Sequence, residues 1–313
     1  MTKFDISIVV LTYNRKDCLK ELLTELVGLS DYVKEIVVID NCSDDGTAEM
    51  LASEFPVVKA TRTHANVGVS ARNRGVREAL GSIVITIDDD IMGLRVADLE
   101  RIRTQFQALP ELAALNFQVR DWFARHTCNW VHHRSIADAE SGFETYEITE
   151  GAVAFRRQPV VDAGGYFEEY FISHEGPDLA FRLMNAGHLV RYDGAIVVYH
   201  KHEQQSRAPW RFYYYDTRNQ LWLAVRNMPW KEGSQYLAKG ITAMAVYALR
   251  DGYFVWWAQG VWDGVRKLPT MVKTREAWTP RTRALCHEID RHRSGFWSTV
   301  RKRLFQPANR LDG

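Results

Sequence analysis

The chain has 313 residues, of which 46% are hydrophobic and 25% charged, and its formal net charge is +1. This length can hold one large domain or two ordinary ones, and the composition excludes a disordered or fibrous protein. The charge is unevenly distributed, because Lys and Arg outnumber Asp and Glu from Gly264 to the end.

The four cysteines lie far apart without paired spacing, which indicates neither a zinc site nor a disulfide framework and favours a reducing compartment. The first residues lead directly into a strand-like pattern without the features of a signal peptide, so we expect a cytoplasmic location. The most apolar stretch, 240–265, is interrupted by Arg250, Asp251 and Asp263. We therefore expect no membrane-spanning helix.

Short apolar runs alternate with amphipathic segments in the first part of the chain. The expected elements are a strand over 6–11, a helix with an apolar face from Leu19 to Val27, a strand over 35–40, a helix over 47–54, a strand over 57–63, a helix capped by Ser70 that ends near Leu80, and a strand over 83–88. This alternation predicts an α/β fold with a mostly parallel sheet flanked by helices.

The second part of the chain has a different pattern. Residues 118–146 are irregular and rich in Trp, His and Arg, and strands are expected over 146–157 and 189–198. From about residue 209 the chain reads as helices in which aromatic residues alternate with Arg and Lys. We therefore expect one domain over 1–205, with halves of about 1–115 and 116–205, and a helical, aromatic and basic region over 206–313.

Polar residues follow three of the expected strands, at 12–15, 40–41 and 88–90. In an open α/β sheet, ligands bind beyond the carboxyl ends of the strands, so these segments mark one binding edge. The chain has no Gly-x-Gly-x-x-Gly turn after the first strand and no P-loop, which excludes a dinucleotide-binding dehydrogenase and a P-loop kinase.

Asp88, Asp89 and Asp90 form a run of three carboxylates at this edge. Adjacent carboxylates repel one another and recruit Mg²⁺ or Mn²⁺, which usually also binds substrate phosphates. Strand alternation places Asp88 and Asp90 on one face. The alternative is a solvated acidic turn.

The order of these motifs resembles glycosyltransferase family 2, whose members have the GT-A fold. The resemblance rests on Ser7–Arg15, Ile39–Thr47, Asn66–Gly68, Ala71–Gly75 and the Asp-x-Asp-like segment Ile87–Asp90. It implies a nucleoside-diphosphate sugar donor held by Thr12, Tyr13, Asn14, Arg15, Asp40, Asn41, Asn66, Gly68, Arg72, Asn73, Asp88 and Asp89. It also implies a divalent metal, Mn²⁺ or Mg²⁺, held by Asp88, Asp90 and His200.

Three of these positions have alternative interpretations. Arg72 offers a planar fork that suits a phosphate but equally suits a structural pair with an Asp. Gly68 can serve a simple turn. His200 can be a hydrogen-bonded residue of the pocket wall, and His202 is expected at the surface.

A further segment resembles the acceptor-side block of the family, which carries the general base. Relatives commonly have Glu-Asp-x-Asp-Leu there, whereas this chain has Gly176 at the second position and so lacks one carboxylate. Glu175 is the expected general base, which removes a proton from the acceptor hydroxyl. Asp178 is the competing candidate, and its alternative role is to cap a helix over 179–186.

The resemblance implies an inverting, metal-dependent glycosyltransferase that uses a UDP- or dTDP-sugar, with dTDP-rhamnose as a candidate donor. The acceptor would be a saccharide or lipid-linked glycan in the synthesis of cell-surface polysaccharide. The alternatives are a non-catalytic sugar-nucleotide-binding or scaffold protein, suggested by Gly176, and a nucleotidyltransferase, against which the missing Gly-rich loop counts.

The basic, aromatic C-terminal region allows two interpretations. Its helices can lie on an anionic membrane, which would make the protein peripheral on the inner face of the cell membrane, or they can pack on the preceding domain. No nucleic acid partner is expected, because no RNA- or DNA-binding motif accompanies the basic residues.

Overall fold

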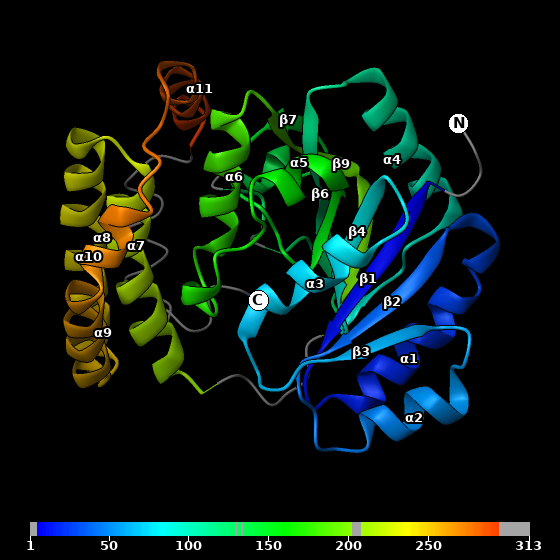
Figure 1. Cartoon of the computed structure of the whole chain (residues 1–313). Coiled ribbons are helices and arrows are strands. Elements are labelled where there is room, and N and C mark those ends of the chain that lie inside the picture. Colours follow the sequence, from blue (N-terminus) through cyan, green and yellow to red (C-terminus); the bar gives the residue numbers. More distant parts are fainter. Residues whose placement is uncertain (1–4, 129, 133, 202–207, 294–313) are drawn as a thin grey trace.

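The computed structural model describes residues 5–293 except 129, 133 and 202–207. A central sheet is flanked by helices on both faces, and helices from the C-terminal part of the chain gather at one side of it (Figure 1). His202 and the last part of the basic region lie outside the described residues.

One sheet contains all the strands of the described residues. These are β1 Ile6–Thr12, β2 Glu35–Asp40, β3 Lys59–Arg62, β4 Ile83–Asp88, β5 Ile91–Met92, β6 Leu112–Asp121, β7 Gly142–Glu144, β8 Ala152–Arg156 and β9 Leu189–His200. Their order is β3-β2-β1-β4-β8-β6-β9-β5, and β7 pairs with β9.

The strands β1 to β4 pair in parallel, as the βα alternation predicts. Strand β8 then enters between β4 and β6 and runs antiparallel to both. The expected α/β fold with a helical C-terminal region is confirmed, and its sheet is parallel in the first half and mixed in the second. The antiparallel insertion brings the start of β8 beside the carboxyl end of β4.

The helices cover both faces of the sheet. They are α1 Lys16–Val27, α2 Thr47–Glu54, α3 Arg72–Glu78, α4 Val96–Ala108, α5 Arg157–Asp162, α6 Glu175–Asn185, α7 Thr217–Asn227, α8 Trp230–Arg250, α9 Phe254–Arg266, α10 Leu268–Lys273 and α11 Pro280–Arg291. Short helical turns at Gly68–Ala71, Glu168–Tyr170 and Phe212–Asp216 join some of these elements.

The core has two layers, because side chains along a strand alternate between its faces. Ile8 and Val10 of β1 pack with α1 and α4, and Val9 packs on the other face with α3 and α6. The C-terminal helices extend this core, since Cys286 of α11 is buried in the second layer and Met271 of α10 is buried near α7.

Three local expectations differ from the structure. The third strand is only Lys59–Arg62, and the strand expected over 146–157 is only Ala152–Arg156, because the residues before it leave the sheet and bond to the Asn116 side chain. Ser70 does not cap α3; it lies within a helical turn and its hydroxyl donates to the carbonyl of Val67.

No helix among the described residues combines the length and the apolar character needed to cross a bilayer.

Candidate active site

The first two loops at the carboxyl edge of the sheet are joined by hydrogen bonds. The backbone N–H of Asn14 donates to the Ser43 hydroxyl at 3.0 Å, and the side-chain oxygen of Asn14 accepts from the N–H of Asp44 at 2.8 Å. Asn14 has a φ of 52°, which asparagine tolerates better than most residues. The two turns predicted to hold the nucleoside therefore lie side by side, with Tyr13 exposed next to them.

Asn41 holds the next loop of this edge. Its amide group donates to Asn66 Oδ1 at 2.9 Å and to the carbonyl of Gly68 at 3.2 Å, and its oxygen accepts from the N–H of Val67. Gly68 has a φ of 69°, and a Cβ atom there would overlap the carbonyl oxygen of Phe171. Glycine is therefore required at this position by the close approach of the segment before α6.

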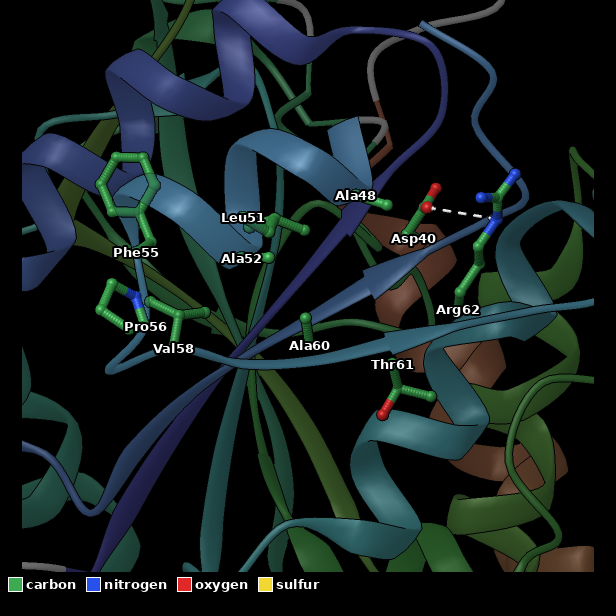
Figure 2. A pocket seen from close by; sticks show the side chains of 10 residues that line it. All are labelled: Asp40, Ala48, Leu51, Ala52, Phe55, Pro56, Val58, Ala60, Thr61 and Arg62. Atoms are coloured by element: carbon green, nitrogen blue, oxygen red, sulfur yellow. Dashed lines mark ion pairs between the residues drawn. The ribbon is translucent and has the colours of Figure 1, made fainter. Parts of the chain in front are cut away.

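A pocket opens beside Asp40, between α2 and β3 (Figure 2). Leu51 of α2 and Phe55, the residue after this helix, form an apolar wall, and Ala60 of β3 lies opposite them. Asp40 and Arg62 point toward one another at its rim, where their side chains are 3.6 Å apart (Figure 2). An apolar wall with a carboxylate at its rim suits a flat ring that carries N–H donors.

The aspartate cluster, Asp88 to Asp90, lies at the end of β4 and is hydrogen-bonded to residues at the end of β1. Asp89 accepts from the hydroxyl of Thr12 at 2.8 Å and from Arg15 at 2.9 Å. The same guanidinium nitrogen of Arg15 donates to Asp90 Oδ2 at 2.6 Å, and Nε2 of His200 lies 3.2 Å from that oxygen. The structure thus brings together residues from three separate segments, 12–15, 88–90 and 200.

The two buried carboxylates of the cluster differ in acidity. Burial raises the pKa of Asp89 to about 6, although the charge of Arg15 opposes this rise. Burial acts on Asp90 in the same direction, but the hydrogen bond and charge of His200, together with Arg15, outweigh it and lower the pKa of Asp90 to about 2. Asp90 is therefore the more strongly ionised of the two.

Asp90 has one oxygen that fits a cation. Within the described residues, no hydrogen-bond donor reaches its buried Oδ1. No group of three or more His, Cys, Asp or Glu side chains suited to a metal was found in that part of the chain. Mg²⁺ and Mn²⁺ need fewer protein ligands when substrate phosphates supply the others, so Asp90 with the neighbouring His200 fits such an ion.

Arg72 on α3 forms an ion pair with Asp88. The guanidinium is buried, and burial lowers its pKa despite the neighbouring Tyr166, Glu150, Glu175 and Asp89. Arg72 thus stands between the aspartate cluster of β4 and the carboxylates near α6. The structural Arg–Asp pair considered for this residue is present.

Glu175 begins α6 and is buried. The residues before it have a strained backbone, since Phe171, Ser173 and His174 all have positive φ values between 65° and 75°. The side-chain amide of Asn219 on α7 donates to the carbonyl oxygens of residues 170, 172 and 173 at 2.7 to 3.1 Å. A helix outside the sheet therefore holds the loop that places Glu175.

Asp178 is the centre of a buried ionic cluster. One oxygen accepts from Arg182, and the other accepts from Arg226 and Asn227, each at 2.7 Å, while the hydroxyl of Tyr170 lies 3.4 Å away. Burial alone would raise the pKa of Asp178. The charges of Arg182 and Arg226 outweigh this effect, so the pKa of Asp178 is lower than its ordinary value. Asp178 lies inside the first turn of α6, so its expected capping role is wrong, because the helix already begins at Glu175.

Asn73 is occupied by a contact within the protein. Its amide group donates to the carbonyl of Tyr166 and its oxygen accepts from the N–H of the same residue, both at 2.7 Å. This pairing joins α3 to the loop before α6.

Sequence reasoning missed Glu150. This residue lies two positions before the start of β8, and its backbone carbonyl accepts from the hydroxyl of Thr86 on β4 at 2.8 Å. Its side chain lies against the backbone of Gly176, where a Cβ atom would overlap Glu150 Oε1. Burial, followed by the charge of Glu175, raises the pKa of Glu150 well above its usual range. The only local signal was the absence of a side chain at position 176.

The fold and this edge of the sheet define a GT-A protein. The crystal structure of Staphylococcus aureus TarS residues 1–349 has a TM-score of 0.58, with 17% identity, over 87% of this chain and 83% of that one. The mannosyltransferase PcManGT from Pyrobaculum calidifontis, in complex with GDP-Man and Mn²⁺, has a TM-score of 0.54, with 19% identity, over 95% and 83% of the two chains.

Residues 7–158 match the family model of glycosyl transferase family 2. The pre-mycofactocin glycosyltransferase of Mycobacterium tuberculosis is 25% identical over 65% of this chain, and the match spans only 44% of its length. The O-antigen chain rhamnosyltransferase RfbN of Salmonella typhimurium is 26% identical over 67% of this chain and 70% of its own. The resemblance seen in the sequence is confirmed.

Proposed function

We propose that the protein is an inverting glycosyltransferase that uses a nucleoside-diphosphate sugar. The observation that carries this proposal is the convergence of Asp89 and Asp90 with Arg15 and His200 at the carboxyl edge of the sheet, where the adjacent Asp88 pairs with Arg72. A donor diphosphate and its cation require this combination of carboxylates and fixed positive charge.

The donor nucleoside lies along the loops after β1 and β2 in this proposal. The pocket beside Asp40 takes the base, whose N–H groups face the carboxylate at the rim. Asp88 faces the ribose and is held in place by Arg72. Tyr13 and Asn14 border the same edge, which gives the donor an aromatic surface and polar contacts.

Asp90 and His200 would hold the divalent cation, and the cation would offset the charge that develops on the departing nucleoside diphosphate. The chain's own contribution is to keep Asp90 ionised, which the charge and hydrogen bond of Arg15 favour. Asp88 remains a predicted third ligand. The Mn²⁺ bound in the mannosyltransferase PcManGT supports a metal in this fold.

The acceptor binds on the side of α6. Glu175 removes the proton from the acceptor hydroxyl as its oxygen attacks the anomeric carbon, and a single displacement of this kind inverts the sugar. Asp178 is the weaker candidate, because both of its oxygens are bonded within the protein.

A surface polysaccharide or lipid-linked glycan is the proposed acceptor, and rhamnose is the first candidate sugar. The likeness to an O-antigen chain rhamnosyltransferase supports this choice, and the likeness to TarS, also crystallised with UDP-GlcNAc, keeps UDP-sugars in the set to be tested.

The C-terminal helices carry a surface suited to an anionic membrane. Exposed apolar side chains along them, which we call the apolar stripe, are Val246 and Leu249 of α8, Phe254, Val255, Trp262 and Val265 of α9 and Val272 of α10. Basic residues such as Arg266 and Lys267 lie beside them and are also exposed. We propose that this stripe rests on the membrane that carries the acceptor.

A thermal-shift panel of UDP-, dTDP-, GDP- and CMP-sugars, each with and without Mn²⁺, tests the proposed function. A ligand that binds only the folded state raises the melting temperature, so we expect a metal-dependent rise with one nucleotide class. Donors that pass this screen are then incubated with candidate acceptors. Binding without transfer to any acceptor would favour a non-catalytic sugar-nucleotide-binding protein.

A further inference from the structure

The missing side chain at position 176 leaves a space that another residue fills. A Cβ atom on Gly176 would overlap Oε1 of Glu150 and would lie 2.5 Å from the carbonyl oxygen of Ile148. The Glu150 carboxylate therefore stands against the second residue of α6, directly beside Glu175. A carboxylate therefore lies beside position 176, although it is carried by the segment before β8 and not by α6.

The backbone of Glu150 is fixed to the donor side of the site. Its carbonyl oxygen accepts from the hydroxyl of Thr86, and the next residue, Gly151, accepts from the N–H of Asp88 at 3.3 Å. A Cβ atom on Gly151 would overlap the Asp88 carboxylate, so the two segments are in close contact. Glu150 thus lies between the aspartate cluster and the start of α6.

The charges around Glu150 suit a group that exchanges a proton. Arg72 attracts its ionised form, whereas Glu175 and Glu147 repel it, and Tyr166 is a further titratable neighbour of the same group. A carboxylate that lies close to a like charge is a candidate for proton transfer.

We propose that Glu150 is the second acceptor-side carboxylate, which replaces a side chain at position 176 and forms with Glu175 the pair that takes the acceptor's proton. This inference rests on the proposed function. The acceptor O–H bond breaks, and the oxygen's electron pair forms the bond to the anomeric carbon. The bond from that carbon to the diphosphate breaks with its electrons on the leaving oxygen, and the proton remains on the Glu150–Glu175 pair.

Glu150→Gln tests this proposal, because glutamine keeps the shape of the side chain and removes its capacity to accept the proton. The assay follows nucleoside diphosphate release from UDP-GlcNAc, dTDP-rhamnose and GDP-mannose, with water as the acceptor and Mn²⁺ present. We expect kcat to fall by about 10²-fold, the scale of a lost general base, while the donor Kd and the melting temperature stay within experimental error of the wild type. Glu147→Gln is the matched control on the same segment and should retain full kcat.

Glu150→Asp is a second variant that keeps the charge and moves it back by one methylene group, and its kcat should lie between those of the wild type and Glu150→Gln. Wild-type kcat in Glu150→Gln would show that the residue only packs against Gly176 and would overturn the proposal. An equal loss in Glu147→Gln would also overturn it. If the wild-type protein releases nucleoside diphosphate from none of the donors, the proposed function is refuted, and so is this inference, which depends on it.

Discussion

The side-chain amide of Asn219 donates a hydrogen bond to the backbone carbonyl of Ser173 at 2.7 Å. It also bonds to the carbonyls of residues 170 and 172, so one side chain on α7 holds most of the strained loop before Glu175. The position of the proposed base therefore depends on a helix that follows the sheet in the chain.

Asn219→Ala should weaken both stability and turnover. It leaves three carbonyl oxygens without this donor, and we expect a loss of about 1–3 kcal/mol in the free energy of unfolding, measured by urea denaturation. Turnover of the folded protein should fall by about tenfold, because a small displacement of a catalytic group is costly. Asn185→Ala, which loosens the far end of α6, should lower stability without lowering turnover. Unchanged turnover in Asn219→Ala would contradict the positioning role.

Asp178→Asn should destabilise the protein more than any single surface change. The substitution leaves Arg182 and Arg226 buried without their counter-charge, which typically costs about 3–5 kcal/mol. Chemical denaturation at pH 7 measures the loss, with the exposed Asp31→Asn as the control. The folded fraction should retain its turnover. A variant of normal stability without turnover would instead identify Asp178 as the general base.

The contribution of Asp178 to stability should depend on pH in a defined direction. Its pKa is lowered in the folded protein, so the folded state binds fewer protons there than the unfolded state, whose ordinary pKa is about 3.9. The stabilisation is therefore present above about pH 4 and is lost as the pH falls further. The difference in urea midpoint between the wild type and Asp178→Asn should be equal at pH 7 and pH 5 and smaller at pH 3. A difference that is unchanged at pH 3 would refute the assignment.

Asp90→Ala should abolish the effect of Mn²⁺ on donor binding. The variant removes the buried oxygen that fits the cation, while Arg15 keeps its bond to Asp89. We expect calorimetry to show a donor Kd that is the same with and without Mn²⁺, whereas Mn²⁺ tightens binding to the wild type by about tenfold or more. Asp31→Asn serves as a folded control. Full Mn²⁺ dependence in Asp90→Ala would place the cation elsewhere.

Trp262→Ser combined with Val255→Ser should reduce sedimentation with vesicles that contain anionic lipid. These two side chains of α9 are 68% and 74% exposed, so their removal changes the surface and leaves the core intact. Deletion of the region from residue 264 is a less suitable test, because Met271 and Cys286 are buried. Equal sedimentation of the double variant and the wild type would refute membrane contact by the apolar stripe.

The sequence predicted the first half of the fold closely, because its signals are local. The runs of β-branched residues at 35–40 and 83–88 coincide with β2 and β4, and the amphipathic segment 47–54 coincides with α2. The aspartate cluster could also be placed, since the carboxyl ends of parallel strands share one edge. Whether its residues bind donor and metal remains a prediction.

Glu150 could not be found in the same way. Its place depends on β8, which enters the sheet antiparallel between β4 and β6, and no pattern near residue 150 encodes this order. The partners of Asp178 were equally hidden, because Arg226 lies far along the chain on α7. The positions of Glu150 and of the partners of Asp178 both depend on tertiary pairing. The glycine at position 176 was visible in the sequence, but it indicated only that a carboxylate was missing there.

The antiparallel pairing of β4 with β8 limits how the protein can open. Five residue pairs, from Ile83 with Arg156 to Ile87 with Ala152, join the strand that ends in the aspartate cluster to the strand that begins after Glu150. The donor and acceptor halves are thus parts of one continuous ladder and cannot hinge apart without breaking it. An acceptor must therefore reach the site without a change in the relative position of the two halves.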